Sequence, residues 1–242
     1  MRLDVLTLFP DMFPGYLGQS ILNKAIERGL VEIHVHNMRD WATGKHKKID
    51  DMPYGGGPGM VLMVDPVVNC VRDVQKMAAE PGQVIMLTPQ GRRLNQPFVE
   101  ELAVKPRLIV LCGRYEGFDQ RVFDILKPIE LSIGDYILNG GEVASMVLID
   151  SLVRMVPGVL GDELSNWDDS FSRGNRLLEH PQYTRPREFE GHEVPEVLLS
   201  GNHPAIESWR KQKSLENTKT KRSDLLDSGP TNGTEGPSNA SS

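Results

Sequence analysis

The sequence has only two cysteines among its 242 residues, Cys70 and Cys112, and they do not form a Cys-x-x-Cys pair. A disulfide framework and a thiolate zinc cluster are therefore both excluded. Apolar runs are short, and one of the longest, Val143–Ile149, is far below the roughly 18 residues of a membrane span. Asp4 and Asp11 interrupt an N-terminal apolar stretch that is too short for a secretory signal. These absences predict a soluble, cytoplasmic protein with no membrane segment.

The sequence also has no excess of basic charge, because it contains 27 Lys and Arg residues and 33 Asp and Glu residues, for a net charge of −6. A histone-like polybasic binder is therefore excluded. The charge is unevenly spread: residues 1–172 carry a net −6, residues 173–222 a net +3 and residues 223–242 a net −3. This change of sign indicates two domains, of which the second suits a polyanionic partner.

Several familiar site motifs are absent. The sequence contains no P-loop, no Gly-x-Gly-x-x-Gly after a strand, no Gly-x-Ser-x-Gly elbow and no His-Glu-x-x-His. The six histidines lack metal-ligand spacing, and His34 and His36 share one strand face without a third ligand. We therefore predict no metal site and expect these histidines to have surface or core roles.

Short apolar runs alternate with helical patterns over the first 160 residues. Asp65 is expected to cap a helix with Pro66 in its first turn. Alternation of this kind predicts an α/β domain with a mainly parallel sheet. The expected strands are Leu3–Phe9, Val31–Val35, Val84–Leu87, Leu108–Leu111 and Ile129–Ile133. The expected helices are Ser20–Arg28, Asp65–Ala78, Leu94–Leu102, Gln120–Leu126 and Glu142–Met155.

The pattern predicts four parts in the chain. Residues 1–160 form the α/β domain, and residues 161–172, where periodicity fails, form a linker. Residues 173–222 form a basic second domain with a helix near Ala205–Leu215. Residues 223–242 form a tail that we expect to be disordered, because from Ser228 onward it is too poor in apolar side chains to offset its ordering entropy.

Three glycine-containing loops follow successive predicted strands: Thr88–Gly91, Gly113–Gly117 and Gly134–Gly141. Ligands of open α/β sheets bind at the carboxyl ends of strands, and glycine lets the backbone approach them closely. The loops indicate either a nucleotide-like pocket or a series of tight turns. A fourth glycine cluster, Tyr54–Gly59, is either a loop that admits a substrate or a solvated connector.

Six motifs of this sequence resemble the TrmD family of bacterial tRNA (guanine-N1)-methyltransferases. The motifs are Met52–Met60, Cys112–Gly117, Ser132–Tyr136, Pro157–Gly161, Asp169–Phe171 and Pro181–Pro186. The resemblance is collinear from Met1 to about Arg222. It implies a SPOUT-type fold with a deep trefoil knot, a small and mostly helical C-terminal domain, and a homodimer.

The resemblance also implies the ligands. S-adenosylmethionine is the expected methyl donor, and the substrate is N1 of the guanosine immediately 3′ of the anticodon (guanosine-37) in tRNA. Magnesium is suggested too, although the sequence shows no local ligand cluster. The residues that match the family's donor site are Leu87, Gly113, Glu116, Ile133, Gly134, Asp135, Tyr136, Ile137, Leu138, Gly140 and Gly141.

Two further residues match the family's catalytic positions. Guanine N1 carries a proton, so methylation needs a base, and Asp169 is the candidate. Arg154 would then stabilise the negative charge that develops at O6. From the residues alone, Asp169 could instead cap a helix and Arg154 could pair with a surface acid.

Two other functions remain open: methylation of a ribose hydroxyl, and RNA binding without catalysis. The first leaves Asp169–Phe171 and the second domain unexplained, and the second leaves the donor loops unexplained. For base methylation of tRNA, the basic second domain is expected to contact tRNA phosphates, which position RNA without reading its sequence. The candidates are Arg173, Arg176, Arg185, Arg187, Arg210, Lys211 and Lys213.

Overall fold

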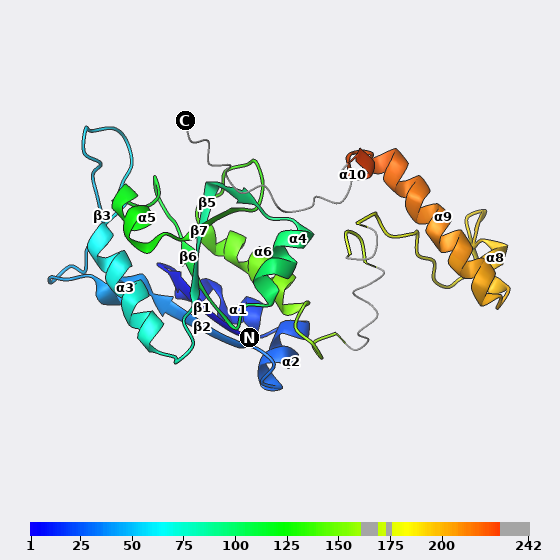
Figure 1. The fold of residues 1–242 in the computed structure, drawn as a ribbon, viewed down its shortest axis with the longest axis horizontal. Coiled ribbons are helices and arrows are strands. Elements are labelled where there is room, and N and C mark those ends of the chain that lie inside the picture. The colour runs from blue at the N-terminus through cyan, green and yellow to red at the C-terminus, as the bar shows by residue number, and fades with distance from the viewer. Residues whose placement is uncertain (161–168, 173–175, 228–242) are drawn as a thin grey trace, which may run out of the picture. The chain divides into compact units, whose positions relative to one another are not determined.

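The computed structural model describes residues 1–160, 169–172 and 176–227. The chain forms two compact units, Met1–Glu163 and Leu164–Ser242 (Figure 1). Most of the predicted linker and most of the predicted tail lie outside the described residues. Within the described ranges, no helix combines the length and the apolar character needed to cross a membrane.

A five-stranded sheet forms the centre of the first unit, in the order β2-β1-β6-β5-β7. Every neighbouring pair in it is parallel. The predicted α/β class with a mainly parallel sheet is thus confirmed. The strands are β1 (Arg2–Thr7), β2 (Glu32–Asn37), β5 (Gln83–Arg93), β6 (Arg107–Cys112) and β7 (Ile129–Ser132).

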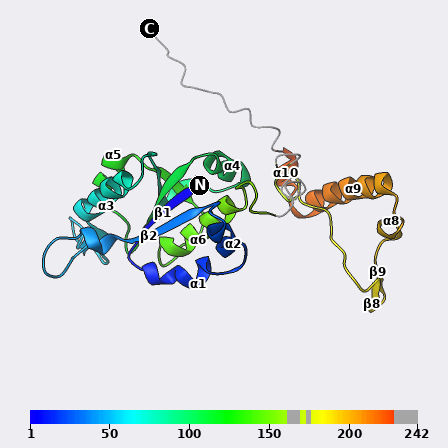
Figure 2. The same ribbon diagram turned by 90° about the horizontal axis from the view of Figure 1, so that it is seen from below.

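Helices cover both faces of this sheet (Figures 1 and 2). Because successive side chains of a strand point to opposite faces, Leu3 and Val5 pack into one core while Leu6 packs into the other. Burial on both faces explains why β6 is apolar almost throughout. The first core is closed by α2 (Ser20–Glu27), α4 (Gln96–Ala103) and α6 (Gly141–Val153), and the second by α3 (Val64–Lys76) and α5 (Gln120–Leu126).

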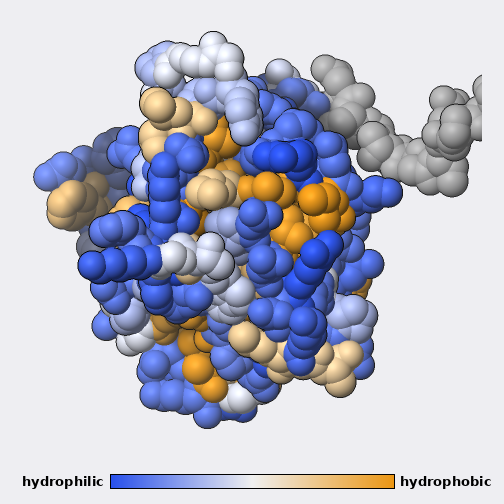
Figure 3. Space-filling view, turned by 90° about the vertical axis from the view of Figure 1, so that its left-hand side faces the viewer, coloured by the Kyte–Doolittle hydropathy of each residue, from blue (hydrophilic) through white to orange (hydrophobic). Residues whose placement is uncertain are grey.

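The α3 helix begins one residue earlier than the sequence predicts. Its N-cap is Met63, so Asp65 is not the cap but an acidic residue of the first turn, where the helix dipole favours it. Its buried residues, such as Val67 and Val71, face the core. Figure 3 views the molecule from the side of α3 and α5, where hydrophilic residues predominate between smaller hydrophobic patches, as expected of an amphipathic outer layer.

Strand β5 is longer than predicted. The expected strand ended at Leu87 before a loop at Thr88–Gly91, but β5 continues to Arg93, with a register shift against β7 between Leu87 and Arg92. Gly91 makes this irregularity possible, because a Cβ there would lie 2.3 Å from the backbone nitrogen of Leu131. Pairing with β7 therefore overrides the local turn signals of this segment.

Smaller elements complete the first unit. A 3₁₀ helix at Pro10–Met12 leads into α1 (Pro14–Leu17), and another 3₁₀ turn spans Met38–Trp41. The two-residue strands β3 (Asp50–Asp51) and β4 (Val61–Leu62) pair antiparallel and frame the fourth glycine cluster.

The second unit contains one long helix, α9 (His203–Lys221), which includes the predicted Ala205–Leu215 and extends beyond it at both ends. Asn202 caps α9, since its side chain accepts a hydrogen bond from the Ala205 N–H at 3.3 Å. The other elements among the described residues of this unit are β8 (Glu188–Phe189), β9 (His192–Glu193), α8 (Glu196–Leu199) and α10 (Asp224–Asp227). Helix α10 corrects the prediction that the tail is disordered from residue 223. The knot stays a prediction.

Candidate active site

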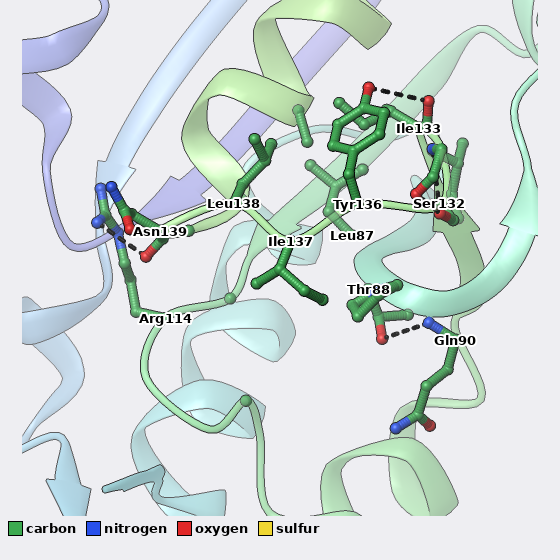
Figure 4. Close-up of a pocket in the computed structure, with 18 of the residues that line it drawn as sticks. Leu87, Thr88, Gln90, Arg114, Ser132, Ile133, Tyr136, Ile137, Leu138 and Asn139 are labelled. Carbon is green, nitrogen blue, oxygen red and sulfur yellow. Dashed lines mark hydrogen bonds between the residues drawn. The ribbon is translucent and has the colours of Figure 1, made fainter. Parts of the chain in front are cut away.

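A cavity of about 300 Å³ opens at the carboxyl ends of β5, β6 and β7 (Figure 4). Three segments build it: the irregular part of β5, the loop after β6 and the loop between β7 and α6. The lining residues are Leu87, Thr88, Pro89, Gln90, Gly113, Arg114, Tyr115, Glu116, Gly117, Leu131, Ser132, Ile133, Gly134, Tyr136, Ile137, Leu138, Asn139, Gly140, Gly141 and Ala144.

Ten of the eleven residues expected to hold the donor line this cavity. Asp135 is the exception, because its side chain is 86% exposed and lies 3.5 Å from Arg93 in an ion pair. The sequence places Asp135 in the correct loop, but only the backbone path decides that its carboxylate points away from the cavity.

Ten other lining residues were not among those matched to the family's donor site. Most of them are neighbours of expected contacts in the same loops, so an extension by one or two positions would have found them. Ala144 gives no such signal, because its position at the cavity depends on the phase of α6. The ten are Thr88, Pro89, Gln90, Arg114, Tyr115, Gly117, Leu131, Ser132, Asn139 and Ala144.

The loop between β7 and α6 supplies apolar side chains to the rim of the cavity (Figure 4). Tyr136, Ile137 and Leu138 are 56%, 82% and 39% exposed. Tyr136 lies over Gly134, where a Cβ would approach its ring to 2.4 Å, and its hydroxyl donates to the Ile133 carbonyl at 3.2 Å. Exposed apolar groups gathered at a cavity are typical of a ligand site.

The pocket glycines are required mainly because loops pack on one another. At Gly141 a Cβ would lie 2.7 Å from the Cα of Cys112, and the Gly141 N–H donates to the Gly113 carbonyl at 2.8 Å. At Gly113 a Cβ would lie 3.1 Å from the Phe118 ring. The sequence predicts that these glycines let a ligand approach the backbone closely. The structure shows a second reason for glycine, since a side chain at either position would crowd a neighbouring segment of the same chain.

The fourth glycine cluster ends beside the cavity. A Cβ on Gly59, whose φ is +88°, would lie 2.3 Å from the carboxylate of Glu116, and the Glu116 N–H donates to the Met60 carbonyl at 3.0 Å. At the other end of the cluster, Tyr54 is fully exposed. The cluster is therefore attached to the pocket at one end and presents an aromatic side chain to solvent at the other.

Asp169 lies in the second unit, where it lines a separate cavity of about 520 Å³. Its carbonyl accepts a hydrogen bond from the Ser172 N–H at 3.1 Å, which closes a turn. The rest of the lining mixes acidic, basic and imidazole side chains with apolar ones: Leu177, Leu178, Glu179, His180, His203, Ile206, Glu207, Arg210, Lys211 and Ser214.

The segment that carries Asp169 is tied to α9. Next to Asp169, the Ser170 hydroxyl accepts from the Glu179 N–H at 3.0 Å. The neighbouring Leu178 is held on both sides of its backbone, since its N–H donates to the Thr218 hydroxyl at 3.0 Å and its carbonyl accepts from the Ser214 hydroxyl at 2.6 Å. Asp169 therefore belongs structurally to the second unit.

Arg154 does not reach the first cavity within its own chain. It is the exposed C-cap of α6, whereas Gly141 at the other end of α6 lines the cavity. Thirteen residues of helix separate them by about 20 Å. The structure thus brings ten of the residues expected to hold the donor together at one cavity but leaves Arg154 apart from them.

The basic side chains of the second unit are surface groups, and several have acidic neighbours. Lys211 and Lys213 each lie 2.6 Å from a glutamate, and Arg187 pairs with Glu196. Exposed pairs of this kind are weak and exchange readily for other anions. Arg173 lies outside the described residues.

A parallel α/β sheet with glycine loops around a cavity at its carboxyl edge is typical of α/β proteins that bind a small ligand there. A family model described as tRNA (Guanine-1)-methyltransferase TrmD matches residues 1–228. The chain belongs to this family, whose fold is of the SPOUT type.

Named relatives cover nearly the whole chain. A tRNA (guanine-N(1)-)-methyltransferase of Rhodopirellula baltica is 65% identical over 227 residues, which are 93% of this chain and 94% of the relative. Proteins with the same name from Bacillus cereus and Bacillus anthracis are each 53% identical over 227 residues, covering 94% of this chain and 92% of the relative.

Proposed function

We propose that the protein transfers the methyl group of S-adenosylmethionine to N1 of the guanosine immediately 3′ of the anticodon, guanosine-37, in tRNA. The observation that carries this proposal is the cavity at the carboxyl edge, lined by ten of the eleven residues that match the family's donor site. A cytoplasmic location follows from a tRNA substrate and stays part of the proposal.

The cavity suits a small adenosine-containing donor. Its volume of about 300 Å³ lies at the lower end of the range for small-molecule sites. Leu87, Ile133 and Leu138 offer apolar surface for a purine, and the glycine loops expose backbone groups for hydrogen bonds. When bound, the donor supplies a methyl group that is activated by its attachment to a sulfonium.

Asp169 is proposed as the general base. In the reaction N1 of guanine gains the methyl group and loses its proton to the Asp169 carboxylate, which becomes neutral. The negative charge that moves toward O6 is stabilised by the guanidinium of Arg154. Because Asp169 is attached to α9, the unit that is proposed to grip tRNA also carries the base.

A homodimer would resolve the separation of Arg154 from the cavity. Val143 and Val147 are 49% and 44% exposed, and they lie with Asp150 and Arg154 on one exposed stripe of α6. A second copy packed on this stripe would cover the two valines, and Arg154 of one subunit could then reach the cavity of the other. We therefore propose that each active site combines residues of two subunits.

Magnesium is not assigned a step. Among the described residues, no group of three or more His, Cys, Asp or Glu side chains is arranged to hold a metal ion.

Single-turnover methylation with labelled donor tests the proposed function. Mass spectrometry of digested tRNA should find N1-methylguanosine at position 37, and replacement of that guanosine should abolish labelling. Asp169→Asn should slow the chemical step by about 10²–10⁴-fold while donor and tRNA affinities change little. Asp168→Asn is the matched control and should be mild. A rate for Asp169→Asn within twofold of the parent would refute the general-base role.

Mixing two inactive variants tests the shared site. Asp169→Asn and Gly113→Val proteins should each be nearly inactive alone. If donor site and base come from different subunits, mixed dimers regain one intact site, and an equal mixture recovers about a quarter of the parent activity. No recovery in subunits shown to exchange would refute the composite site.

A further inference from the structure

Arg114 belongs to the 113–117 loop of the cavity and contacts the 134–141 loop across from it (Figure 4). Its Nη1 donates a hydrogen bond to the Asn139 carbonyl at 3.1 Å, and its backbone forms an antiparallel bridge with Gly140. The side chain also passes directly over Gly140, where a Cβ would lie 2.2 Å from Nε. The position of Arg114 therefore sets the spacing between the 113–117 loop and the 134–141 loop.

Glu142 anchors Arg114 from the first turn of α6. Its carboxylate is 1% exposed, and Oε2 lies 2.8 Å from Nε of Arg114. The two groups form an ion pair, but their geometry is not that of a hydrogen bond. The other oxygen, Oε1, accepts from the Thr7 hydroxyl at 2.7 Å. A buried carboxylate is costly unless it is paired, so Glu142 restrains both of its partners.

The end of β1 completes the arrangement. The Thr7 hydroxyl, which donates to Glu142, accepts from the Phe9 N–H at 2.9 Å. The Phe9 ring lies under the Arg114 guanidinium, 4.4 Å from the ring centroid. Three segments that are distant in the sequence are thus held together through one guanidinium.

We propose that Arg114, Glu142 and Thr7 are positioning residues that hold the two glycine loops in the spacing needed to bind the methyl donor. This inference rests on the proposed function of the cavity. Glu142 neutralises Arg114, so the guanidinium holds loops together and is not a free cation for an anionic ligand. Neither Glu142 nor Thr7 is among the described residues that line the cavity, so both act through Arg114.

The test measures the affinity of the full-length protein for S-adenosylhomocysteine by calorimetry, with the melting temperature of each variant. Glu142→Gln keeps the size of the side chain but removes its charge, and should weaken binding roughly tenfold, as expected when a pocket is correctly formed only a tenth of the time. Thr7→Val is the milder variant, which keeps the ion pair and should weaken binding about threefold. Arg114→Met combined with Glu142→Gln should be no weaker than Arg114→Met alone, because the two residues act as one unit.

Asp4→Asn is the matched control. Asp4 is also a buried carboxylate paired with an arginine, Arg107, but the pair lies nearer the starts of β1 and β6. Measured below its own melting temperature, this variant should lose stability yet keep the parent affinity. Binding within twofold of the parent in both Glu142→Gln and Thr7→Val would overturn the inference, and so would an equal loss of affinity in Asp4→Asn. A parent protein that binds neither S-adenosylhomocysteine nor S-adenosylmethionine would instead overturn the proposed function.

Discussion

Asp4→Asn is expected to be among the most destabilising single substitutions in the first unit. The Asp4 side chain is fully buried and accepts hydrogen bonds from Arg2 at 2.9 and 3.0 Å, from His36 at 2.9 Å and from Arg107 at 2.9 Å. Arg2 and His36 are 21% and 15% exposed, so each can turn toward water. Arg107 is 1% exposed and cannot.

The magnitude follows from Arg107. A guanidinium does not lose its proton inside a protein, so without the Asp4 charge it stays buried and uncompensated. Breaking a buried pair in this way costs about 3–5 kcal/mol, and for a domain of this size each kcal/mol lowers the melting temperature by roughly 2–4 °C. We expect a fall of roughly 6–20 °C. Arg107 also closes the end of α3, because it donates to the carbonyls of Val74, Gln75 and Glu80.

The same pair predicts a pH dependence. Burial acts to raise the pKa of Asp4, but the hydrogen bonds from His36, Arg2 and Arg107 outweigh it and hold that pKa well below its usual range. Because the folded pKa is lower than the unfolded value of about 3.9, the stabilisation is fully present above about pH 5 and is lost as pH falls through the folded pKa. The difference in stability between parent and Asp4→Asn should therefore shrink below about pH 4.

Urea unfolding followed by circular dichroism from pH 3 to pH 7 measures both effects. Asp73→Asn is the control, because Asp73 is half exposed in its pair with Lys76 and should cost less than about 1 kcal/mol. An Asp4→Asn protein within 1 kcal/mol of the parent at pH 7 would refute the reasoning, and so would a difference that grows toward low pH.

Three further outcomes are expected. Gly141→Ala should lower both the melting temperature and the donor affinity, because its Cβ would lie 2.7 Å from the Cys112 backbone; calorimetry that finds both unchanged would contradict this contact. Thr218→Val should slow single-turnover methylation severalfold with donor affinity unchanged, because it removes the hydroxyl that accepts a hydrogen bond from the Leu178 N–H. The control is Thr220→Val, which loses only an exposed hydrogen bond to the Glu216 carbonyl and should leave the methylation rate unchanged. Ending the chain after Asp227 should leave melting temperature and methylation unchanged, and a clear drop in either would mean that residues beyond 227 bind elsewhere on the protein.

Much of the first unit could be predicted from the sequence because the signals are local. The apolar run of β6 and the helical pattern of α5, Gln120–Leu126, match the structure closely, since burial of one helical face or of a whole strand leaves a direct imprint on the sequence. The turn signals Pro89 and Gly91 misled the prediction for β5. There, pairing with β7, a segment about forty residues away, decides the backbone path.

The location of the cavity was also predictable, because parallel strands bring their carboxyl ends to one edge and the glycine loops follow those ends. The reasons why particular residues occupy their positions at the cavity could not be predicted. Gly140 is needed because the Arg114 side chain crosses it, and Asp135 points to solvent although its loop lines the cavity. Neither fact has a local signal, since each depends on the path of a second loop.

By itself, then, the sequence determined the alternation of strands and helices, the parallel sheet, the sheet edge at which the cavity lies and the family. Only the tertiary structure decided that Thr7 and Glu142, 135 positions apart, share a hydrogen bond, that Arg114 joins the two loops, and that Arg154 lies about 20 Å along α6 from the cavity of its own chain. The physical reason is the distance along the chain over which each interaction acts. Periodicity and turn chemistry depend on a few neighbouring residues, whereas the partner of a buried charge is set by the tertiary fold and can come from any part of the sequence.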